Sequence, residues 1–206
     1  MYLTHIQLDL DHPLARADLA DPYEMHSTLA RLMSPSDDQV PSNFLWRSEI
    51  SGPQKISVLL QSNDAPIPER LDVKHRGWAK ALRTKQFNAE ELLKRGDRFL
   101  FRLRANPSVC SSGKRHGLYR EDEQLAWLGR QGERGGFNIE SATISQAQRS
   151  IGQRRKGAHT VVVFDVLFDG VLLKADAALL LATVEQGVGR GKHMGLGLLS
   201  LAALSS

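Results

Sequence analysis

The feature that most constrains this chain's fold is the order of its predicted strands and helices, which is the same in both halves. Residues 2–10 alternate apolar and polar side chains, the pattern of a half-buried strand. The elements predicted for the first half are a strand at 2–10, a helix from Pro22, strands at 44–50 and 55–61, a possible short helix in 65–77 and a short strand at 81–87. Residues 51–53 predict a hairpin between the two middle strands.

The second half repeats this order. Its predicted elements are a strand at 98–105, a helix at 121–131, strands at 137–145 and 160–168, a helix at 175–186 and a strand at 196–203. Two successive βαββαβ units indicate an α+β protein of two tandem ferredoxin-like (RRM-like) domains, which we expect at 1–92 and 93–206. The duplication rests on element order, because no repeat is visible residue by residue.

The sequence predicts where the first helix begins. Asp21 is a good N-cap, Pro22 fits the first helical position, and Glu24 completes a capping pattern two residues further on. Apolar residues then recur at helical spacing and predict the buried stripe, which comprises Met25, Leu29, Leu32 and Met33. The three tryptophans, Trp46, Trp78 and Trp127, are predicted to lie in the core.

Composition excludes several classes of protein. The 206 residues are 41% hydrophobic and 24% charged, as in a globular chain with a sizeable core. A single cysteine, Cys110, excludes an internal disulfide and a zinc site built on cysteines. The first residues lack the pattern of a signal peptide, and no stretch is apolar enough for a membrane span, so we expect a cytoplasmic protein.

Charge is distributed unevenly along the chain. Residues 1–94 carry 11 basic and 13 acidic side chains, whereas residues 95–206 carry 16 and 10. The basic half contains three windows without any acid, at 98–120, 141–164 and 186–206. Such windows favour a polyanionic partner, and arginine suits phosphate because its fork binds two oxygens. Chance clustering in a basic protein is an equally acceptable explanation from composition alone.

A glycine-rich segment is the most specific motif. Five glycines within eleven residues join the predicted last helix to the last strand, and two cations stand among them: Gly187, Gly189, Arg190, Gly191, Lys192, Gly195 and Gly197. Unhindered backbone N–H groups of this kind bind phosphate. The spacing is not that of a P-loop, and the helix-to-strand order is the reverse of a dinucleotide-binding turn. A helix cap followed by a tight turn explains Gly187 but leaves the other glycines unexplained.

Four further segments stand out beside the glycine-rich segment 187–197: the start MYLT, DPYEMH at 21–26, FRLRANP at 101–107 and MGLGLLSL at 194–201. In these segments, and over nearly its full length, the chain resembles the CasE family of CRISPR precursor-crRNA endoribonucleases from type I-E Cascade. The resemblance implies two ferredoxin-like domains, cleavage of a repeat RNA stem-loop, and assembly with other Cascade subunits around the mature crRNA. No cofactor or metal is implied.

Tyr23 and His26 are the candidate catalytic pair. Their spacing of three residues places both on one helix face, away from the predicted buried stripe. Spacing alone favours an ordinary surface pair. The resemblance, however, puts His26 on the family's catalytic histidine and Tyr23 on its tyrosine partner. A histidine can donate or accept a proton near neutral pH, and the sequence leaves open which of the two His26 does. Arg31 is a further candidate, for stabilising charge on the phosphate.

The candidate RNA-binding residues lie in the second half. Arg154, Arg155 and Lys156 are predicted at the tip of a hairpin between the middle strands, a thin cationic element of the kind needed to enter an A-form groove. Arg102 and Arg104 share one strand face and are expected on the same surface, with ion pairs to 121–123 as the alternative. The glycine-rich segment is the third candidate.

The sequence therefore predicts a metal-independent endoribonuclease that binds a repeat stem-loop. Attack by the 2′-OH would give a 2′,3′-cyclic phosphate and a 5′-OH, after which the protein retains the mature crRNA. The alternatives are a non-catalytic RNA-binding subunit of the same fold and a structural subunit that binds proteins through its acidic half. If His26 is not the catalytic histidine, the next candidates are His5, His116, His159 and His193. No histidine pair has the spacing of a zinc motif.

Overall fold

The computed structural model describes the chain except residues 51, 53–54, 154–159 and 205–206. Its internal contacts group into two compact units. The first unit combines Met1–Phe87 with two later segments, Ile151–Val161 and His193–Gly195. The second combines Asn88–Ser150, Val162–Lys192 and Leu196–Ser206. The first unit is therefore completed by short pieces of chain that come from far along the sequence.

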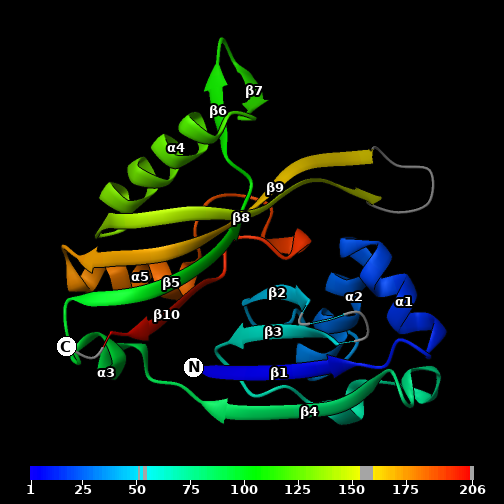
Figure 1. Ribbon diagram of the computed structural model, residues 1–206. Helices are drawn as coiled ribbons and strands as arrows, with labels where there is room; N and C mark the ends of the chain where they lie inside the picture. Colours follow the sequence, from blue (N-terminus) through cyan, green and yellow to red (C-terminus); the bar gives the residue numbers. More distant parts are fainter. Residues whose placement is uncertain (51, 53–54, 154–159, 205–206) are drawn as a thin grey trace. The chain divides into compact units, whose positions relative to one another are not determined.

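The first unit is built on an antiparallel sheet. Its strands are β1 (Tyr2–Leu8), β2 (Phe44–Ile50), β3 (Ile56–Ser62) and β4 (Ala79–Gln86). They lie side by side in the order β2-β3-β1-β4, with β1 paired to both β3 and β4 (Figure 1). Alternation in β1 buries Thr4, Ile6 and Leu8, as the sequence predicts. This is the strand order of a ferredoxin-like fold.

Two helices connect β1 to β2 in the first unit. The sequence predicts α2 (Pro22–Met33) correctly, including its first residue: the Asp21 carboxylate caps the helix by accepting from the backbone N–H of Tyr23 at 2.9 Å. It does not predict α1 (Pro13–Ala20), which precedes α2. Between β3 and β4 the short helix expected in 65–77 takes the form of two 3-10 turns, η1 (Pro68–Arg70) and η2 (Val73–His75).

The second unit repeats the strand order. Its sheet contains β5 (Arg98–Ala105), β8 (Phe137–Gln153), β9 (Thr160–Lys174) and β10 (Leu199–Ala203), arranged as β10-β5-β9-β8. Helix α4 (Glu121–Arg134) connects β5 to β8, and α5 (Ala177–Gln186) connects β9 to β10 (Figure 1). Within the described residues the chain thus has two four-stranded sheets of one topology, and the predicted tandem ferredoxin-like fold is confirmed.

The second unit also departs from the sequence prediction. A short helix, α3 (Ala89–Leu93), and a hairpin of β6 (Ser108–Ser111) and β7 (Lys114–Gly117) are additional. Strands β8 and β9 run past their predicted ends, and the extension of β9 pairs with the first residues of β5, where Arg98 lies opposite Leu173. Strand β10 begins at Leu199 rather than at 196, since Gly197 has a φ of 93° and interrupts the extended backbone.

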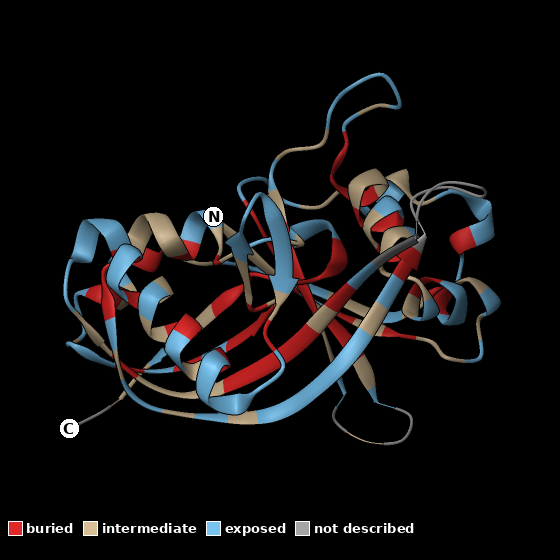
Figure 2. Cartoon of the chain, turned by 90° about the horizontal axis from the view of Figure 1, so that it is seen from above, coloured by how far each residue is buried: buried red, intermediate tan, exposed pale blue. Residues whose placement is uncertain are grey.

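Burial follows the predicted stripes. Met25, Leu29, Leu32 and Met33 of α2 are buried, as are Trp46, Trp78 and Trp127, so both predictions are confirmed. Figure 2 shows the contrast within the second sheet, where β9 is largely buried and the edge strand β8 is largely exposed. Among the helices in the described part of the chain, none combines the length and apolarity needed to cross a bilayer.

Candidate active site and RNA-binding residues

Helix α2 presents Tyr23 and His26 together, as predicted from their spacing. Residues Met25 and Leu29 anchor the opposite side of the helix in the core. The Tyr23 hydroxyl lies 2.9 Å from Nε2 of His193, a hydrogen-bonding distance between residues 170 positions apart in the sequence. The rings of Tyr23 and His193 are 4.9 Å apart between centroids, and those of His26 and His193 are 6.3 Å apart. The three side chains form one cluster within the first unit.

His26 occupies a partly apolar setting. Its ring stacks on Phe44, the first residue of β2, with 4.9 Å between ring centroids. Its Nδ1 atom is buried and has no hydrogen-bond partner among the described residues. Burial, reinforced by the neighbouring His193, lowers the pKa of His26 to about 4. The imidazole is therefore neutral at pH 7 and can accept a proton.

His193 enters this cluster through the glycine-rich segment. It lies on the short turn η3 (Lys192–Met194), and its side chain is exposed. Two glycines let the chain come this close: a Cβ on Gly195 would lie 2.8 Å from the Trp46 ring, and one on Gly152 would lie 2.6 Å from the Tyr23 ring. The sequence identified His193 only as a fallback. Its position beside Lys192 within the glycines was the available signal.

Arg31 lies at the other end of α2. Its Nη1 donates to Oδ2 of Asp72 at 2.6 Å, and Oδ1 of the same carboxylate lies 2.6 Å from Nδ1 of the buried His75. Arg31 is thus held by η2 and its flanking residues rather than by Tyr23 or His26. Its guanidinium is partly exposed.

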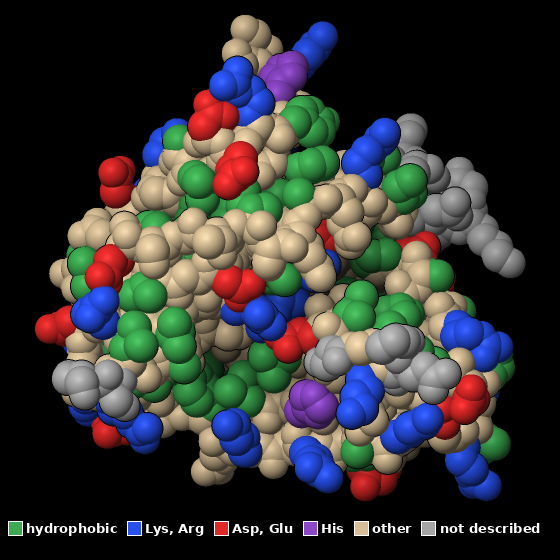
Figure 3. All heavy atoms as spheres, viewed as in Figure 1, with side chains coloured by type: hydrophobic (Ala, Val, Ile, Leu, Met, Phe, Trp, Pro, Cys, Tyr) green, Lys and Arg blue, Asp and Glu red, His purple; other side chains and the backbone are tan. Residues whose placement is uncertain are grey.

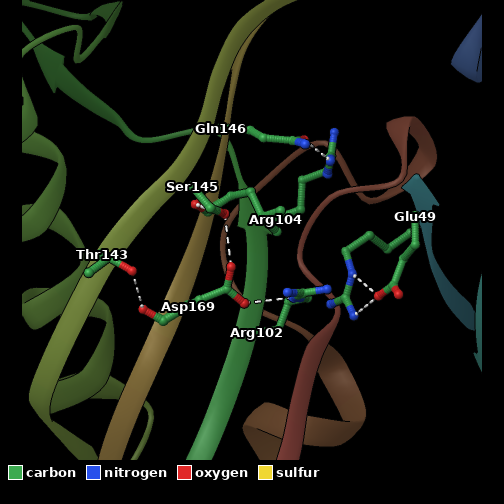
Figure 4. A network of polar contacts seen from close by, with 9 residues as sticks. Glu49, Arg102, Arg104, Thr143, Ser145, Gln146 and Asp169 are labelled. Carbon is green, nitrogen blue, oxygen red and sulfur yellow. Dashed lines mark hydrogen bonds and ion pairs between the residues drawn. The ribbon is translucent and has the colours of Figure 1, made fainter. Parts of the chain in front are cut away.

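The two predicted RNA-binding arginines of β5 are both paired with acids of β9. Asp169 lies directly across the sheet from Arg102 and accepts from its Nε at 2.6 Å, and Ser145 donates to the same carboxylate (Figure 4). Arg104 differs from the exposed position expected of it: the residue is only 7% exposed, and it donates to Asp165 and Gln146. The strand at 98–105 was predicted correctly, but its sequence did not reveal that Arg104 would be buried against Asp165 and Gln146.

The glycines of the loop have a structural explanation. Gly187, Gly189, Gly191, Gly195 and Gly197 all have φ between 73° and 93°, a region that strongly favours glycine. Added Cβ atoms would also meet packed neighbours: a Cβ on Gly189, for example, would lie 3.2 Å from the Trp127 ring. Arg190 and Lys192 are exposed, and no ion pair to either is found within the described residues. The predicted hairpin tip, Arg154, Arg155 and Lys156, lies outside the described residues.

No cluster of three or more histidine, cysteine or carboxylate side chains suited to a metal ion occurs in the described part of the chain. The cluster of Tyr23, His26 and His193 instead offers two imidazoles and a phenol, which are groups for proton transfer and hydrogen bonding. Such a cluster fits acid–base chemistry on a substrate that supplies its own nucleophile.

The family model and the relatives that match this chain carry CRISPR-associated names. The model of the family "CRISPR associated protein" matches residues 1–203. A CRISPR-associated endoribonuclease Cse3 from Thermus thermophilus is 37% identical, over 98% of this chain and all of the relative. The CRISPR system Cascade subunit CasE of Escherichia coli K12 is 34% identical, over 93% and 96%. The structure of CRISPR endoribonuclease Cse3 bound to a 19-nucleotide RNA superposes with a TM-score of 0.87 at 38% identity, covering 98% of this chain and 100% of that one.

The fold, the full-length family match and these identities place the chain among the CRISPR-associated proteins. More particularly, it belongs to the CasE family of type I-E Cascade, which includes Cse3. The resemblance seen in the sequence is thereby confirmed.

Proposed function

We propose that this protein is a metal-independent endoribonuclease that binds the stem-loop of a CRISPR repeat RNA, cuts the precursor crRNA and retains the mature product for Cascade assembly. Its relatives include a named endoribonuclease, a named Cascade subunit and a protein solved with RNA bound. The observation that carries the proposal is the cluster of Tyr23, His26 and His193. It supplies proton-transfer groups where a 2′-OH can act as the nucleophile.

In the proposed mechanism His26 is the general base. A neutral imidazole is needed to take the proton of the 2′-OH, and the pKa of about 4 keeps His26 neutral at working pH. Such a low pKa makes a weak base in the free protein. Binding of the scissile phosphate beside the ring raises that pKa, because a nearby negative charge favours the protonated form. Proton uptake by His26 is therefore promoted by the substrate itself.

The remaining roles follow from the neighbours of His26. The Tyr23 hydroxyl lies at hydrogen-bonding distance from His193 and positions it, or the phosphate, beside His26. The exposed His193 donates the proton to the departing 5′-oxygen, leaving a 5′-OH and a 2′,3′-cyclic phosphate. Arg31, held by Asp72, stabilises negative charge on the phosphate through its free nitrogens.

RNA binding is proposed to involve three groups of residues. The side chain of Arg102 is 45% exposed and can reach a phosphate, whereas the buried Arg104 is proposed to hold β5 and β9 in register rather than to touch RNA. The hairpin tip, Arg154, Arg155 and Lys156, is proposed to enter a groove of the stem. The loop residues Gly187, Gly189, Arg190, Gly191, Lys192, Gly195 and Gly197 are proposed to contact the backbone of the RNA. We keep 1–92 and 93–206 as the proposed domain limits.

One experiment tests the core of this proposal. A labelled repeat hairpin RNA is incubated with the protein in EDTA, alongside the same RNA with a single 2′-deoxy sugar at the scissile position. We expect cleavage of the all-ribose RNA, a cyclic phosphate on the product, and binding without cleavage of the deoxy RNA. The deoxy RNA stays intact because the attacking oxygen is missing.

Other outcomes identify the alternatives. Binding without cleavage of either RNA, under all metal conditions, would indicate a non-catalytic RNA-binding subunit. Absence of RNA binding would indicate a subunit that binds only proteins. Cleavage of the deoxy RNA, or loss of cleavage in EDTA, would mean that water is the nucleophile and that the mechanism above is wrong.

A further inference from the structure

The second unit contains a pocket that the proposed cleavage chemistry does not use. It has a volume of about 410 Å³, within the usual range of ligand sites. It lies beside the hairpin β6–β7, and its walls include Asn106, Ser108, Arg115, Tyr119, Arg149 and Phe164. Figure 3 shows basic side chains and a histidine gathered near the tip of this hairpin, at the top of the view. The pocket thus combines an aromatic wall with positive charge.

Tyr119 provides an aromatic surface that is open to solvent. The residue is 68% exposed, although large aromatic side chains are usually covered. Its ring meets Phe164 edge to face, with 5.0 Å between centroids and 72° between planes. A Cβ at Gly117 would lie 3.3 Å from the Tyr119 hydroxyl, so the glycine there leaves room for the ring. Tyr119 is therefore held in place by Phe164 while most of the residue stays exposed.

The charged residues that line the pocket are both arginines, Arg115 and Arg149, although the acidic first turn of α4 follows Tyr119 in the chain. The lining residues come from two of the acid-free windows of the sequence, 98–120 and 141–164, which the fold brings together here. Arg115 donates to Ser108 at 3.2 Å and keeps its other guanidinium nitrogens for a ligand. Arg149, on β8, is exposed. Two arginines that line one pocket with an aromatic ring suit the phosphate groups of a nucleotide whose base stacks on that ring.

Polar groups complete the pocket. The Asn106 side-chain oxygen accepts from the backbone N–H of Phe164 at 3.3 Å, which leaves the amide NH₂ as a donor. The Ser108 hydroxyl can donate or accept. These groups match the edge of a nucleobase or the hydroxyls of a ribose.

We infer that this pocket binds one unpaired nucleotide of the RNA, with the base stacked on Tyr119 and its phosphates held by Arg115 and Arg149. Stacking of bases on aromatic rings in a cationic groove is the general way in which single-stranded nucleic acid is bound. A paired base has both faces covered inside a helix, so only an unpaired one can use this surface. The inference rests on the proposed function for its RNA, and it adds a subsite for RNA outside the stem.

The test uses hairpin RNAs with a 2′-deoxy scissile sugar, so that none is cut. One RNA is the stem-loop alone, and the others carry unpaired flanks in which 2-aminopurine replaces each unpaired base in turn. Each is titrated with the wild-type protein, Tyr119→Ala and Tyr119→Phe. Arg134→Gln serves as a control, since it removes an exposed charge of α4 outside the pocket. Melting curves check that each variant is folded.

We expect one 2-aminopurine position to be quenched by wild-type protein and by Tyr119→Phe, because a phenyl ring stacks as well as a phenol. Tyr119→Ala should lose that quench and bind the flanked RNA about 5- to 100-fold more weakly, the effect of removing a stacking aromatic. Its affinity for the stem-loop alone should match the wild type. Arg115→Gln should also weaken binding of the flanked RNA, whereas Arg134→Gln should leave that affinity unchanged.

Contrary results separate this inference from the proposed function. If the wild type binds both RNAs and Tyr119→Ala binds them equally well, the pocket is not a nucleotide subsite and the proposed function is unaffected. An equal loss for the stem-loop alone would make Tyr119 a stem contact and overturn the inference. Failure of the wild type to bind any hairpin would instead overturn the proposed function.

Cys110 offers an independent measurement without a change in the pocket. It is exposed, it is the chain's only cysteine, and it pairs with Arg115 across the β6–β7 hairpin. A photo-crosslinker attached to Cys110 should react mainly with the unpaired nucleotide found by quenching. Crosslinks confined to the stem would contradict the inference. Competition by nucleoside monophosphates, with no crosslink to RNA, would assign the pocket to a free nucleotide and would also contradict it.

Discussion

The two sheets of this protein have the same strand order, but the helices that precede their second strands, α2 before β2 and α4 before β8, carry different chemistry. After β1, helix α2 places Tyr23 second and His26 fifth along the helix. After β5, helix α4 has Asp122 and Leu125 at these positions. The first turn of α4 is acidic, which stabilises the helix through its dipole but repels a phosphate. One topology thus supports a candidate catalytic helix in one unit and a structural helix in the other.

The second connections differ as well. Between β9 and β10 the second unit has the regular helix α5, whereas between β3 and β4 the first unit has only η1 and η2. Those short turns supply Asp72, which holds Arg31. The lesson is that the sheet is set by burial of alternate strand residues, while the connections are free to acquire function. The following predictions test this contrast.

The largest effect is expected from the candidate catalytic helix. His26→Asn should lower the cleavage rate by about 10²–10⁴-fold, the usual contribution of a positioned acid or base. RNA affinity should be unchanged, because phosphate contacts elsewhere dominate binding. Single-turnover cleavage and filter binding measure the two quantities. Asp122→Asn on α4 is the matched control and should cleave normally. If His26→Asn cleaves at the wild-type rate, the catalytic histidine must be sought among His5, His116, His159 and His193.

The second prediction concerns pH and assigns the role of His26. As a base with a pKa of about 4, His26 stays deprotonated down to pH 5, so kcat/KM should fall little between pH 7 and pH 5 on its account. A histidine with an ordinary pKa would lose about 30-fold over that range. The pH dependence of kcat/KM, measured with subsaturating RNA, tests this expectation. An increase of about tenfold for each unit of falling pH would contradict His26 as the base, because the limiting group would then act in its protonated form.

The third prediction concerns the basic segment between β8 and β9. Replacing Arg154, Arg155 and Lys156 by alanine should weaken RNA binding and flatten its salt dependence. Each lost phosphate contact should change the log–log salt slope by about 0.7–0.9. Titrations at several salt concentrations measure the slope. The cleavage rate of RNA that is fully bound should hardly change, and an unaltered slope would place the binding surface elsewhere.

The smallest effects are expected from substitutions of the loop glycines. The activity that is lost should differ between Gly195 in the first unit and Gly189 in the second. Gly195→Val forces a left-handed residue against Trp46, and Gly189→Val does the same against Trp127. Each should cost about 1–2 kcal/mol, with a fall in melting temperature of about 2–8 °C. Gly195→Val should reduce cleavage by displacing His193, whereas Gly189→Val should reduce RNA binding. Normal melting and normal activity in both would show that these glycines are not required.

Much of the fold could be predicted from local patterns. The Asp21 cap and Pro22 determine the start of α2, and the strands predicted at 44–50 and 98–105 have the bounds observed for β2 and β5. These predictions succeed because caps and alternating burial depend on neighbouring residues. The β6–β7 hairpin and the extension of β8 were missed, because exposed strands are held by backbone pairing and need no apolar pattern.

The candidate site also has some features that local sequence patterns predict and others that they do not. The sequence by itself determined that Tyr23 and His26 share a helix face, because helical geometry fixes that relation over three residues. Only the tertiary structure decided that His193 meets Tyr23, that burial and the neighbouring His193 lower the pKa of His26, and that Arg104 is buried against Asp165. Contacts between residues so far apart in the chain, and the local dielectric that they create, depend on how the whole chain packs. No local pattern encodes them.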